Sequence, residues 1–469
     1  MTAVGTVENP LRVAIVGSGP AGFYAAGSLL RSKSHPDLGV QVDMYDRLPT
    51  PWGLVRGGVA PDHPNIKAVS RVYEKTAAHP EFRFYGNVEY GRDLHHDDLA
   101  ARYHAVVFAV GSQTDRRLGI PGEDLPGSWA ATELVAWYNG HPDYRGLDFD
   151  LSHERAVVIG NGNVATDVAR MLALTGDELA TTDVADHALE VLAESRVREI
   201  AVLGRRGPAQ VAFTNPELLE LGEMSDADVF VDPEDVELDP LSKAFIESDA
   251  ASTTAKKNVE ILTGYAAREP TGKPRRIVLR FLVSPVAILG EERVEGIRIC
   301  HNELVADESG SIRARPTDVF EEIECGLVFR SIGYRGTPLG GLPFDERRCV
   351  IPNEGGRILA SGRPLPGEYV VGWIKRGPTG IIGTNKRDAQ ETVDQLLEDL
   401  DAGRLLDPPE PDRGSLEELL AERAPDHVTY AGWEAIDRAE KAAGEPQGRP
   451  RVKLCSFEEL LDAARERVS

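Results

Sequence analysis

The sequence predicts an α/β protein with two doubly wound domains, one of which is discontinuous along the chain. Two observations support this fold class: a strand, a glycine-rich turn and a helix follow one another over residues 11–30, and the same order returns over residues 155–174. With 469 residues, the chain is long enough for two large domains or about three of average size. Its 41% hydrophobic and 27% charged residues are typical of a globular protein and argue against a disordered or fibrous one.

The first glycine-rich turn has the form of a Rossmann-like dinucleotide site. Residues 11–16 are expected to form a buried strand, which leads into Gly17-Ser-Gly-Pro-Ala-Gly22 and a helix from Phe23 to Leu30. A second strand, Val40 to Tyr45, ends at Asp46, 24 residues beyond the last glycine. The glycines would let the backbone approach a pyrophosphate at the helix N-terminus, and the acid would accept hydrogen bonds from a ribose. The alternative is a glycine turn without a ligand.

A second turn of the same kind lies near residue 160. The strand Arg155–Ile159 leads into Gly160-Asn-Gly-Asn-Val-Ala165, and a helix is expected from Thr166 to Leu174. Ala165 stands where the third glycine would be, which is a variant that dinucleotide sites tolerate. These residues again predict a pyrophosphate at a helix N-terminus.

Two arginines distinguish the second site from the first. The strand Glu199–Leu203 ends in Gly204-Arg-Arg-Gly207, where the first unit has its acid. Two guanidinium groups in place of that acid predict a 2′-phosphate, hence NADP, whereas Asp46 predicts an unphosphorylated ribose. The alternative is that Arg205 and Arg206 are solvated surface charges. A helix-like stretch over residues 177–196 lengthens the connection between the turn and these arginines.

Two further strands, residues 105–110 and 327–332, end at a glycine and predict where the chain crosses between the domains. We expect the domain with the first glycine turn at residues 1–112 and 339–469, and the other domain at residues 113–338. The patterns also predict a strand-rich stretch at 259–330, with alternation such as that of residues 276–283, a strand at 368–373 and helices at 381–400, 416–421 and 457–464. The last two helices belong to a C-terminal extension, residues 408–469, which is predicted to be acidic and helical.

The charge and the cysteines exclude several classes of protein. A net charge of −24 argues against nucleic acid or an anionic membrane surface as partner, and no apolar run reaches the roughly 18 residues that a membrane span needs. Four cysteines occur without a Cys-x-x-Cys pair, which argues against a dithiol centre, a locally bound iron–sulfur cluster and a structural zinc site. We therefore expect no metal, and few scattered cysteines suggest a reducing cytoplasm.

Two dinucleotide sites in one chain are explained most simply by hydride transfer between them. A tightly held FAD in the first site would receive hydride from an exchanging NADPH in the second, and a flavin can release electrons one at a time. Without a dithiol, the electrons must leave by another route than thiol–disulfide exchange.

Four motifs in this chain resemble the adrenodoxin reductase family, and the resemblance covers nearly the whole chain. They are Leu48-Pro-Thr-Pro-Trp-Gly-Leu-Val-Arg-Gly-Gly-Val-Ala-Pro-Asp-His-Pro64, the second glycine turn at 160–165, Gly204-Arg-Arg-Gly-Pro208 and Gly372-Trp-Ile-Lys-Arg-Gly-Pro-Thr-Gly380. The bacterial ferredoxin–NADP reductases of that type are the most similar. The resemblance implies that the chain binds FAD and NADPH and passes electrons singly to a ferredoxin-like iron–sulfur protein.

The resemblance also assigns residues to each cofactor. Together with the glycines of the first turn, it implies FAD contacts at Gly17, Gly19, Ala21, Gly22, Asp46, Leu54, Val88, Trp373, Gly380, Ile381 and Ile382. It implies NADP contacts at Arg116, Gly162, Asn163, Val164, Ala165, Arg205, Arg206, Glu217 and Gly380. This chain departs from the family at Asp46, where glutamate is usual. It also lacks the cysteines of the family variant with a fused ferredoxin, so its acceptor must be a separate protein.

Three polar residues are candidates for a role beside the reacting rings. His63 lies in a proline-bounded loop and could orient the rings or exchange a proton near them, or it could be a loop histidine with structural hydrogen bonds. Asp167 follows the second glycine turn and could act there or cap a helix start. Glu217 could cap a helix or hold the nicotinamide amide, and we favour the second. None needs to be a strong acid or base, because hydride transfer depends mainly on positioning.

The partner is predicted to be a ferredoxin-like iron–sulfur protein, which could in turn supply a cytochrome P450. Ferredoxins are generally acidic, and residues 325–387 carry 10 bases and 4 acids, net +6, in an otherwise acidic chain. A basic patch near the flavin would steer such a partner, mostly through its association rate. The candidates for this patch are Lys375, Arg376, Lys386 and Arg387, with Arg330, Arg335, Arg347 and Arg348 nearby in sequence. Some of these could instead neutralise cofactor phosphates.

Three other functions fit parts of the sequence. An NADPH-dependent flavin subunit of a larger oxidoreductase, such as the small subunit of glutamate synthase, would normally add cysteine-bound clusters. A flavin monooxygenase would need a substrate cavity and a stable oxygen adduct. A binding or scaffold protein without turnover would not need the paired arginines or the residues predicted at the nicotinamide.

Overall fold

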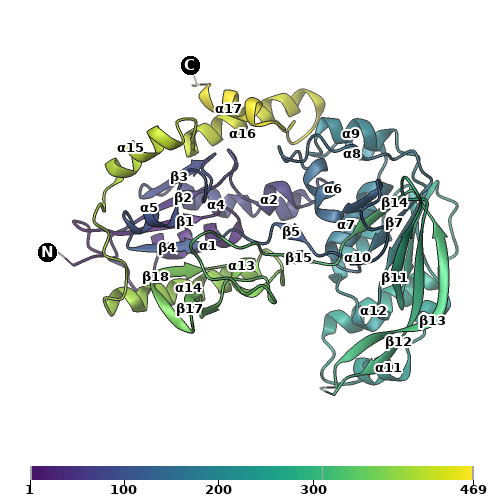
Figure 1. Cartoon of the computed structure of the whole chain (residues 1–469). Helices are drawn as coiled ribbons and strands as arrows, with labels where there is room; N and C mark the ends of the chain where they lie inside the picture. The colour runs from purple at the N-terminus through teal and green to yellow at the C-terminus, as the bar shows by residue number, and fades with distance from the viewer. Residues whose placement is uncertain (1–2, 309, 467–469) are drawn as a thin grey trace. The chain divides into compact units, whose positions relative to one another are not determined.

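The computed structural model describes residues 3–308 and 310–466, and these residues divide into two compact units (Figure 1). The first unit contains the chain up to Val59, His63–Thr114 and the chain from Gly333 onward. The second contains Ala60–Asp62 and Asp115–Ile332. The boundaries lie at 114/115 and 332/333, whereas the sequence predicts 112/113 and 338/339, and the short segment Ala60–Asp62 joins the second unit.

The first unit is built on an eight-stranded sheet in the order β16-β17-β18-β4-β1-β2-β3-β19. Its central strands are parallel: β18 (Arg363–Val370), β4 (Ala105–Phe108), β1 (Leu11–Val16), β2 (Val40–Tyr45) and β3 (Phe82–Gly86). The antiparallel additions are β16 (Asn353–Glu354), β17 (Arg357–Ala360) and β19 (Val428–Thr429). All six residues of β1 are buried, because hydrophobic clusters cover both faces of the sheet.

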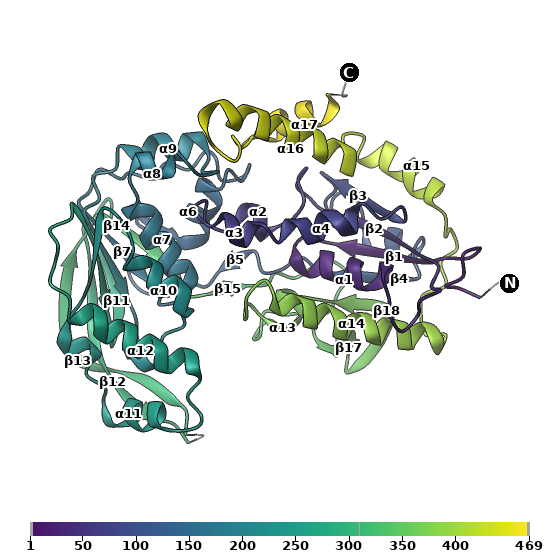
Figure 2. The ribbon, with the colours of Figure 1, turned by 180° about the vertical axis from the view of Figure 1, so that it is seen from behind.

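Helices cover this sheet, and α1 (Pro20–Leu30) packs along α14 (Thr384–Asp401), as both ribbon views show (Figure 2). The C-terminal helices run along the β3 side of the unit, and both views show them in yellow. They are α15 (Arg413–Arg423), α16 (Tyr430–Gly444) and α17 (Phe457–Arg465). The remaining helices of the unit are α2 (Leu54–Gly57), α3 (Pro64–Lys67), α4 (Ser70–Ala77), α5 (His96–Ala100) and α13 (Trp373–Arg376), with a 3-10 turn at Glu445–Gln447.

The second unit is built on a six-stranded parallel sheet in the order β6-β14-β7-β8-β10-β9. These strands are β6 (Ser128–Ala130), β14 (Leu327–Arg330), β7 (Arg155–Ile159), β8 (Glu199–Leu203), β10 (Arg275–Arg280) and β9 (Ala227–Val231). A separate antiparallel sheet contains β11 (Val283–Leu289), β12 (Gly296–Ala306) and β13 (Ile312–Glu324).

The helices of the second unit include α7 (Asn163–Ala173), which follows β7 through the second glycine turn. The others are α6 (Ala131–Tyr138), α8 (Gly176–Leu179), α9 (Asp186–Ala193), α10 (Asn215–Leu221), α11 (Pro240–Glu247) and α12 (Thr253–Ala266), with 3-10 turns at Pro208–Gln210 and Pro233–Val236. The two chain segments that lead from one unit to the other pair with each other as β5 (Thr114–Asp115) and β15 (Tyr334–Arg335). No helix in the described residues is long and apolar enough to cross a membrane.

The strands next to the glycine turns agree with the predicted bounds, whereas several other elements differ. Both helices begin inside the glycine motif, at Pro20 and Asn163, because the chain turns into the helix directly after the middle glycine. The stretch 259–330 is rich in strands, as predicted, although α12 occupies its start. The alternating residues 276–283 belong to two strands, because Leu282, with φ +54°, breaks the extended backbone between β10 and β11. Helix α16 lies in the extension that was predicted to be helical, but its bounds were not predicted; it buries Trp433 and Ile436 against the core.

Candidate cofactor sites

The first glycine turn contains two glycines that the fold requires, Gly17 and Gly22, and one that it does not require, Gly19. Gly17 has φ +109°, and a Cβ there would lie 2.5 Å from the Ala109 carbonyl oxygen. A Cβ on Gly22 would lie 2.2 Å from the Gly17 carbonyl oxygen. Gly19 differs, because its φ of −75° suits any residue and a Cβ would meet no atom within 4 Å. Gly19 therefore borders open space, which fits the close approach of a pyrophosphate.

The second glycine turn, in the other unit, likewise contains a glycine that the fold requires and a middle glycine that it does not. Gly160 has φ +136°, and a Cβ there would lie 2.1 Å from the Ser331 carbonyl oxygen. Gly162 has φ −108°, and a Cβ on it would meet no atom within 4 Å, as at Gly19. Ala165 is fully buried, so its methyl group fills the contact between helix and strand that a third glycine would leave to backbone.

Both helices that follow these turns begin without a capping side chain. The N-cap residues are Gly19 for α1 and Gly162 for α7, and neither helix has an acidic residue in its first turn. The free N–H groups and the positive end of each helix dipole are thus available to an anion. The first turn of α7 also holds Asn163, whose Oδ1 accepts a hydrogen bond from the Thr214 amide at 2.8 Å and so connects this turn to the start of α10. Val164, the next residue, is half-buried.

Asp46, at the end of β2, binds the first glycine turn directly. Its Oδ2 accepts hydrogen bonds from the Ser18 amide at 3.0 Å and the Ser18 hydroxyl at 2.5 Å, and its Oδ1 accepts one from the Leu48 amide at 2.9 Å. Burial raises the pKa of Asp46 above its ordinary value, while these hydrogen bonds act in the opposite direction. Val88 is buried beside it and donates its amide to the Asp46 carbonyl at 2.9 Å. The sequence predicted the acid but not its bond to Ser18.

The Gly372–Ile382 segment lies against the start of α1. Gly372 has φ +77°, and a Cβ there would lie 2.7 Å from the Cβ of Ala21. Trp373 has a buried Nε1 that finds no hydrogen-bond partner among the described residues. Ile381 is 62% exposed, Ile382 is half-buried, and Gly380 has φ +81°.

Two apolar side chains of the first unit that were predicted to contact FAD are exposed. Leu54 is 40% exposed on α2, and Ile381 is 62% exposed before α14. Together with the unsatisfied Trp373 Nε1 and the open space at Gly19, they fit a bound cofactor with both apolar and hydrogen-bonding surface.

The predicted basic patch is wrong in two of its members, Lys375 and Arg376. Lys375 is buried, and its Nζ binds the carboxylates of Asp388 at 3.2 Å and Glu391 at 2.7 Å. Arg376 pairs with the same Asp388 at 3.2 Å, so both cations hold α13 to α14 and leave no free charge. Arg330 belongs to the second unit, where it is buried beside Glu123. Spacing in the sequence could not show this, because the partner carboxylates lie on other elements. Of the other candidates for the patch, Arg335, Arg347, Arg348, Lys386 and Arg387 are exposed and belong to the first unit.

Three arginines were assigned to NADP, and the structure leaves two of them exposed. Arg205 is exposed and Arg206 half-buried in the turn after β8, and Arg116 is exposed after β5. Burial and the neighbouring charge of Arg205 lower the pKa of Arg206. Two like charges held side by side at the end of a strand would be stabilised by an anion, as the proposed 2′-phosphate requires.

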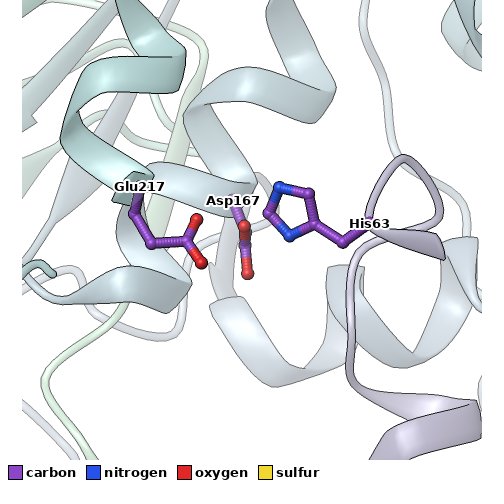
Figure 3. A group of neighbouring side chains, drawn as sticks. All are labelled: His63, Asp167 and Glu217. Atoms are coloured by element: carbon purple, nitrogen blue, oxygen red, sulfur yellow. The ribbon is translucent and has the colours of Figure 1, made fainter. Parts of the chain in front are cut away.

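Asp167 and Glu217 reach toward the same space from α7 and α10 in the second unit (Figure 3). Between them lies Arg170, which sequence reasoning missed. It is 3% exposed, donates to Asp167 at 2.7 Å and lies 3.6 Å from the Glu217 carboxylate. It also binds Asp62 at 2.6 Å. Burial opposes the charge of Arg170, but the surrounding carboxylates raise its pKa, so it remains a cation.

These contacts exclude helix capping for Asp167 and leave both alternatives open for Glu217. Asp167 lies beyond the first turn of α7 and accepts from Arg170, so it is not a helix cap. Glu217 lies in the first turn of α10, where it favours the helix electrostatically and faces Arg170. Figure 3 also labels His63, which precedes α3 in the first unit and is buried.

Comparisons with known proteins agree with this picture. Residues 11–203 match the pyridine nucleotide-disulphide oxidoreductase family. The NADPH-ferredoxin reductase FprA of Mycobacterium tuberculosis is 53% identical over 460 residues, which cover 97% of this chain and 99% of that protein. The mitochondrial NADPH:adrenodoxin oxidoreductase of Arabidopsis thaliana is 43% identical, over 97% of this chain and 96% of that one. A structure of Mycobacterium tuberculosis FprA in complex with NADPH has 52% identity and a TM-score of 0.92, over 97% of this chain and 100% of that chain.

The predicted fold class is confirmed by this structural match and by the parallel sheet in each unit. The resemblance noted in the sequence is confirmed by relatives that share about half of their residues with nearly the full chain. The chain therefore belongs to the NADPH-ferredoxin reductase family, the flavoprotein oxidoreductases of the adrenodoxin reductase type.

Proposed function

We propose that this chain is an NADPH:ferredoxin oxidoreductase whose acceptor is a separate ferredoxin-like iron–sulfur protein. One observation carries the proposal: each unit has a glycine turn with an open middle glycine, but only the second is followed by two arginines. FAD, when bound, accepts a hydride from NADPH and releases electrons one at a time. The first unit would hold FAD and the second NADP(H), with domain limits near 1–112 with 339–469 and 113–338.

Residues of the first unit would hold FAD along its length. The open backbone at Gly19 and the free amides of α1 would bind the pyrophosphate, and Asp46 would bind the adenosine ribose. Asp46 Oδ1 has a second lone pair for this, since the described residues show one hydrogen bond to that atom, from the Leu48 amide. Leu54 and Trp373 would contact the flavin end, where the buried Trp373 Nε1 has no hydrogen-bond partner among the residues that the structure describes. The other contacts would come from Gly17, Ala21, Gly22, Val88, Gly380, Ile381 and Ile382.

Residues of the second unit would hold NADP(H). The turn at Gly162–Ala165 would bind the pyrophosphate, and Arg205 and Arg206 would bind the 2′-phosphate, assisted by Arg116. Glu217 would accept hydrogen bonds from the nicotinamide amide. Arg170 supports this role, because it fixes both Asp167 and Glu217 and offsets part of their charge. These carboxylates and His63 would orient the nicotinamide rather than transfer a proton, since hydride transfer needs alignment of the reacting carbons.

The cysteines favour a one-electron acceptor over a disulfide substrate. All four cysteines lie in described residues and are buried and unpaired. Burial raises the pKa of the Cys325 thiol to about 12 and that of Cys455 to about 11, so both remain unreactive thiols. Disulfide chemistry, which the broader family name suggests, therefore lacks its pair of thiols here. Unpaired thiols also suit the cytoplasm, where we place the protein.

An acidic ferredoxin would meet the exposed cations of the first unit. Arg335, Arg347, Arg348, Lys386 and Arg387 stay available for this after Lys375 and Arg376 are excluded. Electrostatic attraction of this kind acts mainly on the association rate. A cytochrome P450 could consume the reduced ferredoxin, and the sequence of this chain carries no feature specific to it.

The test is NADPH-driven reduction of a panel of purified ferredoxins. We expect a yellow protein with about one FAD per chain, rapid bleaching of the flavin absorption by NADPH without oxygen, and turnover with at least one ferredoxin. NADH serves as the matched control and should bleach the flavin far more slowly. A colourless protein, or a flavin that NADPH reduces but no ferredoxin reoxidises, would refute the proposal. Stopped-flow mixing of the reduced protein with oxygen would reveal a monooxygenase by a long-lived flavin–oxygen adduct.

A further inference from the structure

The loop before α2 packs directly on the first glycine turn. The Trp52 amide donates to the Ser18 carbonyl oxygen at 3.0 Å. Gly53 follows with φ +50°, and a Cβ there would lie 2.9 Å from the Cα of Gly19. Leu54, the next residue, is exposed at the start of α2. The position of this loop therefore shapes the open space beside Gly19.

Trp52 holds an unfavourable backbone conformation in that loop. Its φ is +86°, which a bulky residue rarely adopts. Such a conformation persists only where surrounding contacts enforce it. Besides its bond to Ser18, one contact of Trp52 comes from the C-terminal extension, more than 370 residues later in the sequence. The ring of Trp433 lies edge-on to that of Trp52, with 4.8 Å between centroids.

The second contact is a buried ion pair between α2 and α16. Arg56 donates two hydrogen bonds to Glu440, at 2.8 Å and 2.5 Å, and its guanidinium lies 5.4 Å from the ring centre of Trp433. Glu440 is 0% exposed and also accepts from Arg451 at 2.9 Å and from the Leu454 amide at 3.0 Å. Burial alone would raise the pKa of Glu440, but the two arginines lower it, so it is a carboxylate.

We infer that Glu440 is a positioning residue for FAD: with Arg56, Arg451 and Trp433 it forms a C-terminal clamp that holds Trp52–Leu54 against Gly19. This rests on the proposed FAD site in the first unit. A buried ion pair often adds little net stability compared with an apolar pair of the same shape. The two hydrogen bonds from Arg56 to Glu440 do fix the orientation of the two side chains, and here they fix the position of α2, the helix that begins at Leu54. When the clamp opens, the loop can relax from its strained conformation and FAD can leave.

The test is the rate of FAD release from Glu440→Gln in the full-length holoprotein. Breaking one partner of a buried, hydrogen-bonded charge pair should raise this rate more than about tenfold. The matched control is Arg465→Gln, which removes an ion pair with Asp426 in the same C-terminal region, where both side chains are 58% exposed. The control should release FAD at the wild-type rate. Release is followed by the rise of flavin fluorescence after dilution.

The unfolding free energies of the holoprotein and the apoprotein distinguish a residue that positions FAD from one that only stabilises the fold. The clamp acts through FAD, so Glu440→Gln should reduce the stabilisation that added FAD provides more than it reduces the stability of the apoprotein. Equal losses in both forms would overturn the inference. If Glu440→Gln fails to fold, Arg56→Met with Glu440→Met removes both charges, while Arg451 keeps its ion pair with Asp437 at 2.8 Å. This double variant should fold and release FAD faster.

The outcomes distinguish this inference from the proposed function. A wild-type protein that binds no FAD would overturn both. A yellow wild-type protein, whose clamp variants release FAD no faster than Arg465→Gln, would overturn the inference and leave the proposed function intact.

Discussion

Replacing Gly19 with alanine should remove FAD without unfolding the protein. The added methyl group meets no atom within 4 Å, and φ −75° with ψ −177° is a conformation that alanine adopts freely. The methyl group would instead occupy the space where the backbone approaches the pyrophosphate. The same substitution at Gly17 should unfold the turn, because φ is +109° and the methyl group would lie 2.5 Å from the Ala109 carbonyl oxygen.

The expected free energies have opposite signs in the two variants. Gly19→Ala should stabilise the apoprotein by about 0.4–1 kcal/mol, because alanine restricts the unfolded chain. A hundredfold weaker affinity for FAD would at the same time remove about 2.7 kcal/mol of FAD-linked stability. Gly17→Ala should destabilise the apoprotein by about 1–3 kcal/mol through backbone strain and overpacking.

The assay compares denaturant midpoints of the apoproteins, followed by circular dichroism, with FAD content after gel filtration. We expect Gly19→Ala to match or exceed the wild-type midpoint and to elute colourless. Gly162→Ala is the matched control in the other unit, since its methyl group also meets no atom and it should stay yellow while losing NADPH binding. Gly19→Ala that keeps its FAD at the wild-type affinity would refute the reasoning, and so would loss of the apoprotein fold in that variant.

Three further predictions follow from the charged residues. Replacing Arg205 and Arg206 together with alanine should raise the KM for NADPH more than about tenfold and leave the KM for NADH nearly unchanged, since each charge-assisted bond contributes about 1.5–3 kcal/mol. The measurement is steady-state kinetics with both nucleotides, and a double variant that still prefers NADPH over NADH would refute this. Replacing Lys386 and Arg387 with glutamine should slow the reduction of an acidic ferredoxin and weaken the dependence of that rate on salt, while the reduction of a small neutral acceptor is unaffected. If the rates with the two acceptors fell in parallel as salt rises, docking at Lys386 and Arg387 would be contradicted. A hydrogen bond to a carboxylate on β18 raises the pKa of His96, so its contribution to stability should be complete below about pH 6.5 and fade as pH rises through the raised pKa. Denaturant midpoints of the wild type and His96→Gln should therefore converge at high pH, and a constant difference would contradict this.

Much of the cofactor machinery could be predicted because its requirements are local. A turn between a buried strand and a helix needs glycine at positions such as Gly17, where the backbone itself enters the left-handed region. The choice between Asp46 and the pair Arg205–Arg206 depends on the charge of one ribose substituent, and those residues follow their strands directly. Such features lie within a few residues of one another, so they can be predicted from their spacing in the sequence.

Only the tertiary structure decided which residues the buried charges pair with. Lys375 was predicted at a docking surface but binds Asp388 and Glu391, and Arg170 was overlooked although it organises both predicted carboxylates. The bounds of α16 were not predicted, nor was the ion pair of its Glu440 with Arg56. A buried charge is stable only beside a partner, and that partner is set by how distant elements pack. Composition and periodicity describe each element alone, so they predict where a charge lies in the chain but not what it contacts.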